Sequence, residues 1–437
     1  MTAATGLQAL SGSTLVGIAV SVVTVLAFAA LGYRAFLRFY DDARSAVLGE
    51  RFVPYPAQPG RKLLLRCFSA TLLLRLGFYC LAYLLGVVFR QQPVNPFTAI
   101  ANMLSRWDGP HYLDIARYGY GTEGELAYNI VFFPLFPWQV RGFMLLTGDA
   151  FWAAQIVNLL CSAGACYLLY RLAEPSMGAS AWRAVMWFLL FPTAFYLMLP
   201  YSEALFIALT LACFLMLQRG RFLPAALLGG LAAMTRNVGV LLALPYVLAA
   251  VLAWVGERRP ARGYTPLRSD ATARLWARLS GVLLIGCGTL VYLLVNKLVF
   301  GNAWVFLETQ RNHWQQGFGW FFNTAALIVR YTFSGDMAQT LYLWLPQLVI
   351  MIFSYIVLYR CRARSSPAQL MFAFVYFFFV LSATWLLSGA RYMLALFPLF
   401  IMLAQSVPKA KTWLLAVPMA AVQIFLAIAH MFGQYVF

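Results

Sequence analysis

Long apolar runs separated by short polar segments recur along the whole chain. Each run has about 20 residues, the length that a helix needs to cross a hydrocarbon core of roughly 30 Å. The polar segments carry clustered arginines, and such clusters mark the cytoplasmic side of a membrane. Alternation from these clusters predicts about twelve transmembrane helices with both chain ends outside. The predicted spans lie near residues 13–33, 66–89, 151–171, 183–199, 202–218, 222–235, 238–255, 278–300, 339–360, 368–387, 392–407 and 412–434.

Two long segments fall on the outer side of this predicted all-α, polytopic fold, at about residues 90–150 and 301–338. The first holds acids, amides and aromatics. Its helical pieces, 99–118 and 131–146, are predicted to lie in the membrane interface rather than to span it. We divide the chain into an N-terminal extra helix with a basic cytoplasmic loop, residues 1–62, and a transmembrane domain, residues 63–437.

Composition excludes a soluble fold. Hydrophobic residues make up 62% of the chain and charged residues 11%, whereas soluble domains carry about 25% charged residues. The residues that give the net charge of +18 cluster between the predicted spans, as in cytoplasmic loops. The expected partners are therefore membrane lipids and not nucleic acid. The 7 cysteines fall in apolar runs or at their cytoplasmic ends, and neither a disulfide nor a cysteine-ligated metal is expected.

The first outer segment contains a candidate base, Asp108, in the run from Arg106 to Tyr112. A carboxylate held at the membrane surface could take a proton from an attacking hydroxyl. The alternative is that Asp108 only caps a helix that starts near Gly109. His111 and Asp114 share a helix face and could join Asp108 around a metal, but two or three ligands at this spacing are weak evidence against ordinary surface residues.

Further ionisable residues are predicted on the same outer side. Arg236 and Arg391 end apolar helices there, where a guanidinium suits a phosphate. The alternative is that both extend to the lipid headgroups. Glu203 begins an outer-side helix, where the helix dipole favours a carboxylate, or it orients a substrate or pairs with an arginine. Arg75, in the middle of a predicted span, is left without a role.

Several short motifs between residues 97 and 402 resemble, in their order, the membrane mannosyltransferases of the PIG-V family (GPI mannosyltransferase II) and its bacterial relatives. The matching pieces are Arg106-Trp107-Asp108, His111 to Ala116, Tyr118-Gly119-Tyr120, Phe132 to Pro137, Phe191 to Phe195, Tyr201 to Phe206, Thr235-Arg236, Phe300-Gly301, Gln310-Arg311, Arg391-Tyr392 and Phe397 to Phe400. Each piece alone is weak evidence, whereas the ordered set is fairly specific.

The resemblance implies a GT-C glycosyltransferase fold and a polyprenyl-phosphate sugar donor such as dolichyl-phosphate mannose. In such folds an acid of the first outer loop lies at the active site, and this role maps onto Asp108. Enzymes of this type that use lipid monophosphate sugars are thought to need no metal. Many of them carry two adjacent acids in this loop, whereas Gly109 follows Asp108 here, so we expect neither a metal nor another cofactor.

We therefore predict transfer of a hexose, mannose first, from a polyprenyl phosphate to a hydroxyl of a glycolipid or glycan acceptor on the outer, periplasmic or lumenal, face. Asp108 is the predicted base, and Arg236 and Arg391 are predicted to bind the donor phosphate. The predicted substrate contacts are Trp107, His111, Tyr112, Asp114, Tyr201, Glu203 and Arg311.

A transporter or flippase of lipid-linked sugars is the alternative. Transporters often have matched halves with broken helices at the middle of the membrane, whereas the ionisable residues here gather at one face. A non-catalytic scaffold leaves the outer arginines unexplained. Arginine greatly outnumbers lysine, which favours a bacterial inner membrane over an endoplasmic reticulum; the lysines are Lys62, Lys297, Lys409 and Lys411.

Overall fold

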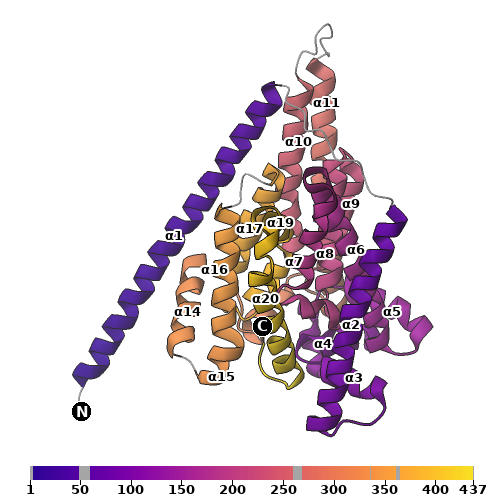
Figure 1. Ribbon diagram of the computed structural model, residues 1–437, viewed down its shortest axis with the longest axis vertical. Helices are drawn as coiled ribbons and strands as arrows, with labels where there is room; N and C mark the ends of the chain where they lie inside the picture. The colour runs from indigo at the N-terminus through magenta and orange to yellow at the C-terminus, as the bar shows by residue number, and fades with distance from the viewer. Residues whose placement is uncertain (1–2, 49–59, 259–267, 335, 361–364, 437) are drawn as a thin grey trace.

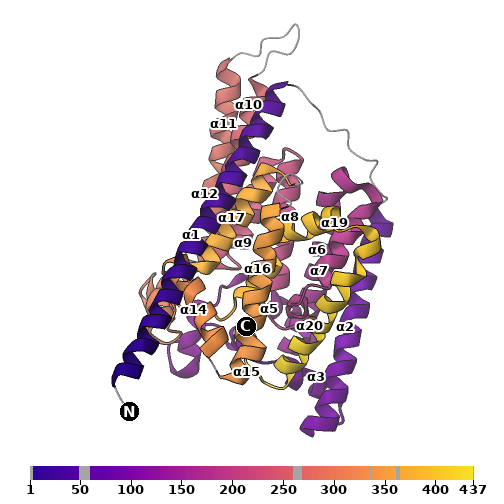
Figure 2. The same ribbon diagram turned by 60° about the vertical axis from the view of Figure 1, so that its left-hand side comes forward.

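The computed structural model is an elongated bundle of helices, shown in two views in Figures 1 and 2. It describes residues 3–48, 60–258, 268–334, 336–360 and 365–436. Within these ranges no strand forms, and one isolated bridge joins Phe318 to Ala383. The predicted all-α, polytopic fold is confirmed.

The helices are α1 (Ala3–Leu48), α2 (Gly60–Arg90), α3 (Pro96–Leu104), α4 (Asp108–Tyr118), α5 (Leu135–Thr147), α6 (Ala150–Met177), α7 (Trp182–Leu189), α8 (Glu203–Gln218), α9 (Phe222–Ala233), α10 (Ala243–Glu257), α11 (Arg268–Leu279), α12 (Gly281–Phe300), α13 (Val305–Asn312), α14 (Phe321–Ser334), α15 (Met337–Gln339), α16 (Leu345–Arg360), α17 (Pro367–Leu381), α18 (Gly389–Tyr392), α19 (Phe397–Ser406) and α20 (Trp413–Met431). Short 3₁₀ segments connect them: η1 (Gly124–Val131), η2 (Gly178–Ala181), η3 (Ala194–Met198), η4 (Asn237–Leu242), η7 (Met393–Ala395) and η8 (Lys409–Lys411). A short π-helical segment, η5 (Thr340–Trp344), lies between α15 and α16.

Among the described residues, 7 helices are long and apolar enough to cross a membrane, or up to 9 if each of two bent pairs is one span. The bent pairs are η1 with α5 and α18–η7 with α19, and the shorter apolar helices are α8, α9 and α17. The long helices, the shorter apolar helices and the pair α18–η7 with α19 agree in order and approximate position with the predicted spans other than the one near 183–199, whereas η1 with α5 lies in the predicted outer segment. Parts of the predicted basic loops, residues 49–59, 259–267 and 361–364, lie outside the described residues.

The predicted span near residues 183–199 is wrong. Helix α7 ends at Leu189, and the backbone then runs irregularly through η3 to the start of α8. Pro192 and Pro200 interrupt the chain here, because proline cannot donate a helical hydrogen bond. Irregular backbone is stable at membrane depth only where other protein groups form hydrogen bonds with its N–H and C=O groups.

Neighbouring helices supply those groups to the irregular segment. Arg75 of α2 donates to the Leu197 carbonyl at 2.8 Å and also bonds Gln155 of α6. Asn158 of α6 donates to the Tyr201 carbonyl at 3.1 Å. Arg75, which the sequence left without a role, therefore supports the loop that precedes α8.

The interfacial pieces also differ from the predicted ones. The piece at 99–118 is two helices, α3 and α4, because the chain turns at Trp107, whose φ of 53° is left-handed. The piece at 131–146 is α5 alone, preceded by η1 and a bend of 119°. Pro134 stands immediately before α5. Proline has no backbone N–H, and at the start of a helix this N–H would have no helical partner in any case.

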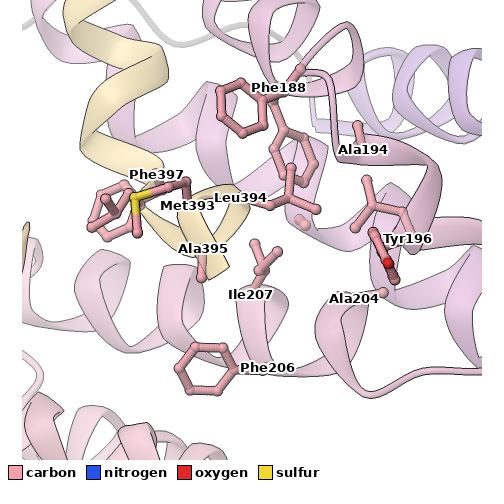
Figure 3. Packing of buried hydrophobic residues seen from close by; sticks show 14 of the residues in the cluster. Phe188, Ala194, Tyr196, Ala204, Phe206, Ile207, Met393, Leu394, Ala395 and Phe397 are labelled. Carbon is pink, nitrogen blue, oxygen red and sulfur yellow. The ribbon is translucent and has the colours of Figure 1, made fainter. Parts of the chain in front are cut away.

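The core of the bundle joins η3, the start of α8, and the α18–η7–α19 segment. Figure 3 shows Tyr196, Ile207 and Leu394 among the buried side chains that meet there. Close backbone contact sets the position of α9 beside α12: a Cβ at Gly288 would lie 1.9 Å from the Gly230 carbonyl oxygen. Small residues let membrane helices approach in this way. The contact fixes the position of α9, and Arg236 lies just beyond the end of this helix.

Helix α1 lies along one edge of the bundle, beside α14 and α17 (Figure 1). Phe28 anchors it among the rings of Phe321, Phe374 and Phe377. The guanidinium of Arg34 stacks 4.0 Å from the centre of the Tyr359 ring. The division of the chain at residue 62 remains a prediction.

Candidate active site

Four charged residues from separate parts of the chain meet at one end of the bundle. Asp108 is the first residue of α4, and Glu203 is the first residue of α8. Arg236 lies between α9 and η4, and Arg391 lies in α18, the short turn before η7 and α19. Each stands where a helix begins or breaks, so its side chain leaves the helical packing and can reach the others.

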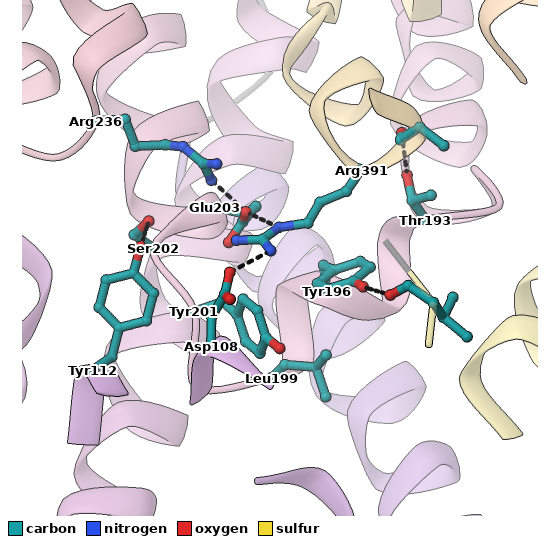
Figure 4. Close-up of polar contacts among 12 residues, drawn as sticks. Asp108, Tyr112, Thr193, Tyr196, Leu199, Tyr201, Ser202, Glu203, Arg236 and Arg391 are labelled. Atoms are coloured by element: carbon teal, nitrogen blue, oxygen red, sulfur yellow. Dashed lines mark hydrogen bonds and ion pairs between the residues drawn. The ribbon is translucent and has the colours of Figure 1, made fainter. Parts of the chain in front are cut away.

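Arg391 connects the two acids, as Figure 4 shows. Its terminal nitrogen lies 2.6 Å from Asp108 Oδ2, and its Nε donates to Glu203 Oε1. Arg236 donates to the same Glu203 oxygen. Two guanidinium groups and two carboxylates thus form one charge-balanced cluster. This pairing lowers the free-energy cost of burying each charge in a membrane protein.

The cluster is closed on one side and open on the other. The side chains of Arg391 and Glu203 are each 4% exposed, whereas that of Asp108 is 29% exposed. Asp108 is therefore the carboxylate that a substrate can reach. Arg391 fixes its orientation from the buried side.

Tyrosine rings surround the arginines. The Arg391 guanidinium carbon lies 4.6 Å from the centre of the Tyr201 ring and 5.1 Å from that of Tyr196. Arg236 lies 4.9 Å from the centre of the Tyr392 ring. Cations over such ring faces are stabilised by roughly 0.5–2 kcal/mol each, so the rings hold both guanidinium groups without neutralising them.

Asp108 does not cap α4. The helix begins at Asp108 itself, the N-cap residue is Trp107, and no side chain there accepts a hydrogen bond from the helix. The carboxylate bonds Arg391 instead. The capping explanation that the sequence left open is therefore wrong, because the turn at Trp107 points Asp108 across the bundle.

Glu203 has one oxygen left over. Both arginines bond Oε1, while Oε2 is buried without a hydrogen-bond partner among the described residues. A buried carboxylate oxygen without a partner loses the free energy of its hydration, about 1–3 kcal/mol or more for a charged group.

Tyr112 and Tyr201 tie the outer loop to the start of α8. The Tyr112 hydroxyl lies 2.9 Å from the Ser202 hydroxyl, and the Tyr201 hydroxyl donates to the Arg106 carbonyl at 2.8 Å. Burial raises the pKa of Tyr112, so its phenol stays neutral at physiological pH. Both residues position Asp108 and Glu203 relative to each other.

Other predicted contacts lie farther from the cluster. His111 is stacked on Phe132, and its Nδ1 lies 2.8 Å from the Asn129 side chain. Asp114 pairs with Arg117 at 3.6 Å. Arg311 is exposed on α13, a helix without buried residues, and the structure does not bring it to the cluster.

The C-terminal segment contributes residues that sequence reasoning missed. Tyr435 packs on Trp107 with ring centres 4.4 Å apart, and the Tyr196 hydroxyl donates to the Val436 carbonyl. Burial and the charge of Asp108 raise the pKa of Tyr435. Two neighbouring rings had a signal in the sequence, since Tyr392 is part of the motif Arg391-Tyr392 and Tyr196 follows the motif that ends at Phe195. Tyr435 had none, because only folding brings it to Trp107.

No three His, Cys, Asp or Glu side chains gather as metal ligands in the described part of the chain. Asp108 bonds Arg391, and Asp114 bonds Arg117, so neither is oriented toward His111. Whether the protein uses a metal stays a prediction from the sequence.

Part of this chain matches known mannosyltransferases. Residues 133–266 match the family described as dolichyl-phosphate-mannose-protein mannosyltransferase. GPI alpha-1,6-mannosyltransferase 2 of Cricetulus griseus is 34% identical over 149 residues, and that of Homo sapiens is 30% identical over 154 residues. The predicted resemblance to PIG-V-like membrane mannosyltransferases is confirmed.

The alignment with these relatives is partial. It covers 31% of this chain and 29% of the length of the hamster and human proteins. The segment that matches the family contains Glu203 and Arg236, whereas Asp108 and Arg391 lie outside it.

A solved structure also resembles the bundle. ArnT from Cupriavidus metallidurans, bound to undecaprenyl phosphate, is 18% identical with a TM-score of 0.47 over 76% of this chain and 64% of that chain. The same protein in the apo state has a TM-score of 0.46.

Proposed function

We propose that this PIG-V-like protein transfers a hexose, with mannose as the first candidate, from a polyprenyl-phosphate sugar to a hydroxyl of a glycolipid or glycan. The observation that carries the proposal is the half-open ion cluster, in which Arg391 holds an accessible Asp108 beside a second buried arginine. The proposed site lies on the non-cytoplasmic face, in a bacterial inner membrane rather than an endoplasmic reticulum.

In the proposed reaction the acceptor hydroxyl attacks the anomeric carbon of the donor sugar. A new carbon–oxygen bond forms, and the bond between that carbon and the phosphate oxygen breaks. The polyprenyl phosphate leaves with the electron pair, and the hydroxyl proton passes to Asp108. Attack opposite the leaving group inverts the anomeric configuration. A positioned base contributes typically 10²-fold to 10⁴-fold to such a step.

Arg391 and Arg236 have the proposed role of binding the donor phosphate. A phosphate diester carries one negative charge, and both guanidinium groups keep donors that Glu203 and Asp108 do not use. When the phosphate takes the Arg391 nitrogen that now bonds Asp108, the carboxylate is freed to accept a proton. The same contacts stabilise the negative charge that grows on the leaving phosphate.

Glu203 and the outer tryptophan complete the proposed donor site. Glu203, whose side chain is 4% exposed, holds Arg391 and Arg236 in place for the donor phosphate. Trp107 is 40% exposed beside Asp108 and offers an apolar face for a sugar ring. His111, Asp114 and Arg311 lie outside the cluster, so their proposed contacts are with a larger acceptor.

Transfer of label tests the function. Purified protein is incubated with radiolabelled polyprenyl-phosphate mannose and lipids extracted from the host, with Asp108→Asn as the matched inactive control. We expect a labelled, mannose-bearing product with the wild type only. Movement of intact donor across a vesicle membrane, without a labelled product, would instead establish the transporter alternative.

A further inference from the structure

The chain turns back toward the ion cluster after α20. This helix ends at Met431, and Gly433 then adopts a left-handed φ of 76°. The Gly433 N–H donates to the His430 carbonyl at 2.9 Å, and the Gln434 N–H donates to the Ala429 carbonyl at 2.9 Å. A left-handed residue with such bonds ends a helix and redirects the chain. The residues that follow therefore leave the helix axis and pack on another part of the bundle.

Contacts at both ends hold this segment after α20 in place. Arg90 donates to the Phe432 carbonyl, and its guanidinium carbon lies 4.9 Å from the centre of the Phe432 ring. At the other end, Val436 is 1% exposed, and its carbonyl accepts a hydrogen bond from the Tyr196 hydroxyl. The side chain of Tyr435, which lies between these contacts, is therefore positioned before a substrate arrives. Such preorganisation lowers the entropy cost of binding.

Tyr435 stands beside the proposed base. Its ring packs edge to face on that of Trp107 with ring centres 4.4 Å apart, and Trp107 directly precedes Asp108. Burial and the charge of Asp108 raise the pKa of Tyr435, so the phenol keeps its proton at physiological pH. The effect of a charge on another group declines with distance. The hydroxyl is thus a neutral hydrogen-bond donor near the carboxylate.

The Tyr435 hydroxyl is available to a substrate. No other described residue forms a hydrogen bond with it, and Tyr435 is 42% exposed beside Trp107, which is 40% exposed. By contrast, three buried tyrosines of the site already bond protein groups through their hydroxyls: Tyr112, Tyr196 and Tyr201. Tyr435 therefore keeps the donor that these tyrosines have already used.

The neighbouring contacts connect Tyr435 to the donor side of the proposed site. Tyr196, which bonds the residue after Tyr435, also covers Arg391, whose guanidinium carbon lies 5.1 Å from the centre of the Tyr196 ring. Arg391 has the proposed role of binding the donor phosphate. Because one ester oxygen joins the donor sugar to that phosphate, the sugar lies close to Arg391. Trp107 and Tyr435 then present an apolar ring face and a hydroxyl to this sugar.

We propose that Tyr435 contacts the donor sugar, with its hydroxyl donating to a sugar hydroxyl while Trp107 covers an apolar face of the sugar ring. The inference rests on the proposed function, in which a polyprenyl-phosphate hexose is the donor. Tyr435 then recognises the sugar, whereas Arg236 and Arg391 bind the phosphate. Loss of the hydroxyl should therefore weaken binding of the sugar-bearing lipid and leave the sugar-free lipid unaffected.

Equilibrium binding without an acceptor tests this division. The probes are undecaprenyl-phosphate mannose and undecaprenyl phosphate, each titrated into the protein in phosphatidylcholine nanodiscs. We expect Tyr435→Phe, which keeps the ring on Trp107, to weaken binding of undecaprenyl-phosphate mannose about fivefold, the effect of one lost neutral hydrogen bond. Binding of undecaprenyl phosphate should be unchanged. The control Tyr118→Phe, at the exposed far end of α4, should alter neither.

Two binding results would overturn the inference. Weakening of undecaprenyl phosphate that equals or exceeds that of the mannose-bearing lipid in Tyr435→Phe would show that the hydroxyl only maintains the fold of the site. Wild-type binding of both lipids in Tyr435→Phe would show that the hydroxyl contacts no sugar. Tyr435→Ala would then report whether the ring itself supports Trp107.

Steady-state transfer separates the inference from the proposed function. Tyr435→Phe should raise the KM for the donor and leave the KM for the acceptor unchanged. A rise in the acceptor KM alone would overturn the inference while the proposed function stands. Absence of any transfer by the wild type would contradict the proposed function, and the two binding titrations would still decide whether Tyr435 contacts the sugar.

Discussion

At the scale of single residues, the site depends on one guanidinium that serves two acids. Arg391 holds both Asp108 and Glu203, and its remaining surface is covered by Tyr196 and Tyr201. Asp108 is the member of this cluster with the most exposed side chain, at 29%. Substitutions at these positions should therefore fail in different ways.

Asp108→Asn keeps the size of the side chain but cannot accept a proton. We expect turnover to fall by about 10²-fold to 10⁴-fold with donor binding nearly intact. Single-turnover transfer and donor binding, measured on the same preparation, check this. Wild-type turnover in Asp108→Asn would show that the carboxylate is not the base.

Arg391→Ala and Arg236→Gln should separate stability from donor binding. Arg391→Ala leaves two carboxylates with one arginine, and loss of a buried partner of this kind costs about 3–5 kcal/mol, so we expect a lower Tm. Arg236→Gln keeps Arg391 and should mainly weaken donor binding, by roughly 1.5–3 kcal/mol. Thermal unfolding and donor titration measure the two effects, with Arg219→Gln as the exposed control. Equal behaviour of all three variants would contradict the assignment.

At the scale of elements, the broken segment between α7 and α8 places both Tyr196 and Glu203. Its carbonyls bond Arg75 and Asn158, which stand inside long apolar helices. The sequence shows these two residues as isolated polar positions, and only the packing of α2 and α6 against the segment explains them. The loop is therefore an obligatory part of the bundle.

Arg75→Met should destabilise this element although Arg75 does not touch the cluster. The change removes the guanidinium from the Leu197 carbonyl and from Gln155 Oε1, which keep only the Ser162 hydroxyl at 3.4 Å and the Tyr79 hydroxyl at 2.8 Å. Loss of a charged donor at such buried groups costs about 1–3 kcal/mol. We expect a lower Tm and reduced transfer. Arg61→Gln, at the exposed start of the same helix, should change neither. An unaffected Tm in Arg75→Met would mean that water replaces the guanidinium.

At the scale of the whole molecule, helix α11, which carries Arg274 and Arg278, and helix α4, which begins at Asp108, lie toward opposite ends of the bundle (Figure 1). Helices α10 and α11 lead to one end, while α3 and α15 lie at the other (Figure 1). Arg219 lies in the turn between α8 and α9, away from Glu203 and Arg236 at the other ends of these helices. This separation is what the alternation of basic loops predicts.

Thiol accessibility tests the orientation in the membrane. In a variant without native cysteines, Glu123→Cys should react with an impermeant maleimide in intact cells, since it lies in the first outer segment. Arg219→Cys should react only after lysis, because arginine-rich turns stay inside. The reverse pattern would put the proposed site on the cytoplasmic face.

Chelation tests the prediction that no metal takes part. Asp108 has Gly109 rather than a second acid beside it, and a single carboxylate paired with an arginine is a poor site for a divalent cation. Transfer should be unchanged in EDTA. A loss that manganese or magnesium restores would contradict this prediction and make His111 and Asp114 candidate ligands.

The sequence by itself determined the class of protein, the order of the helices and the identity of the charged residues at the proposed site. Apolar length and clustered arginines follow from the cost of placing charge in hydrocarbon, and this cost acts on each segment locally. The motifs likewise singled out Asp108, Glu203, Arg236 and Arg391 before their partners were known.

Only the tertiary structure decided which of these residues touch, and why. Two arginines bond one oxygen of Glu203, and Asp108 pairs with Arg391 instead of capping α4. The ring of Tyr435 packs against that of Trp107. Such contacts join residues far apart in the chain, so no local pattern encodes them. Position along the helix axis and rotation about it, set by close contacts such as Gly230 with Gly288, determine which side chains meet.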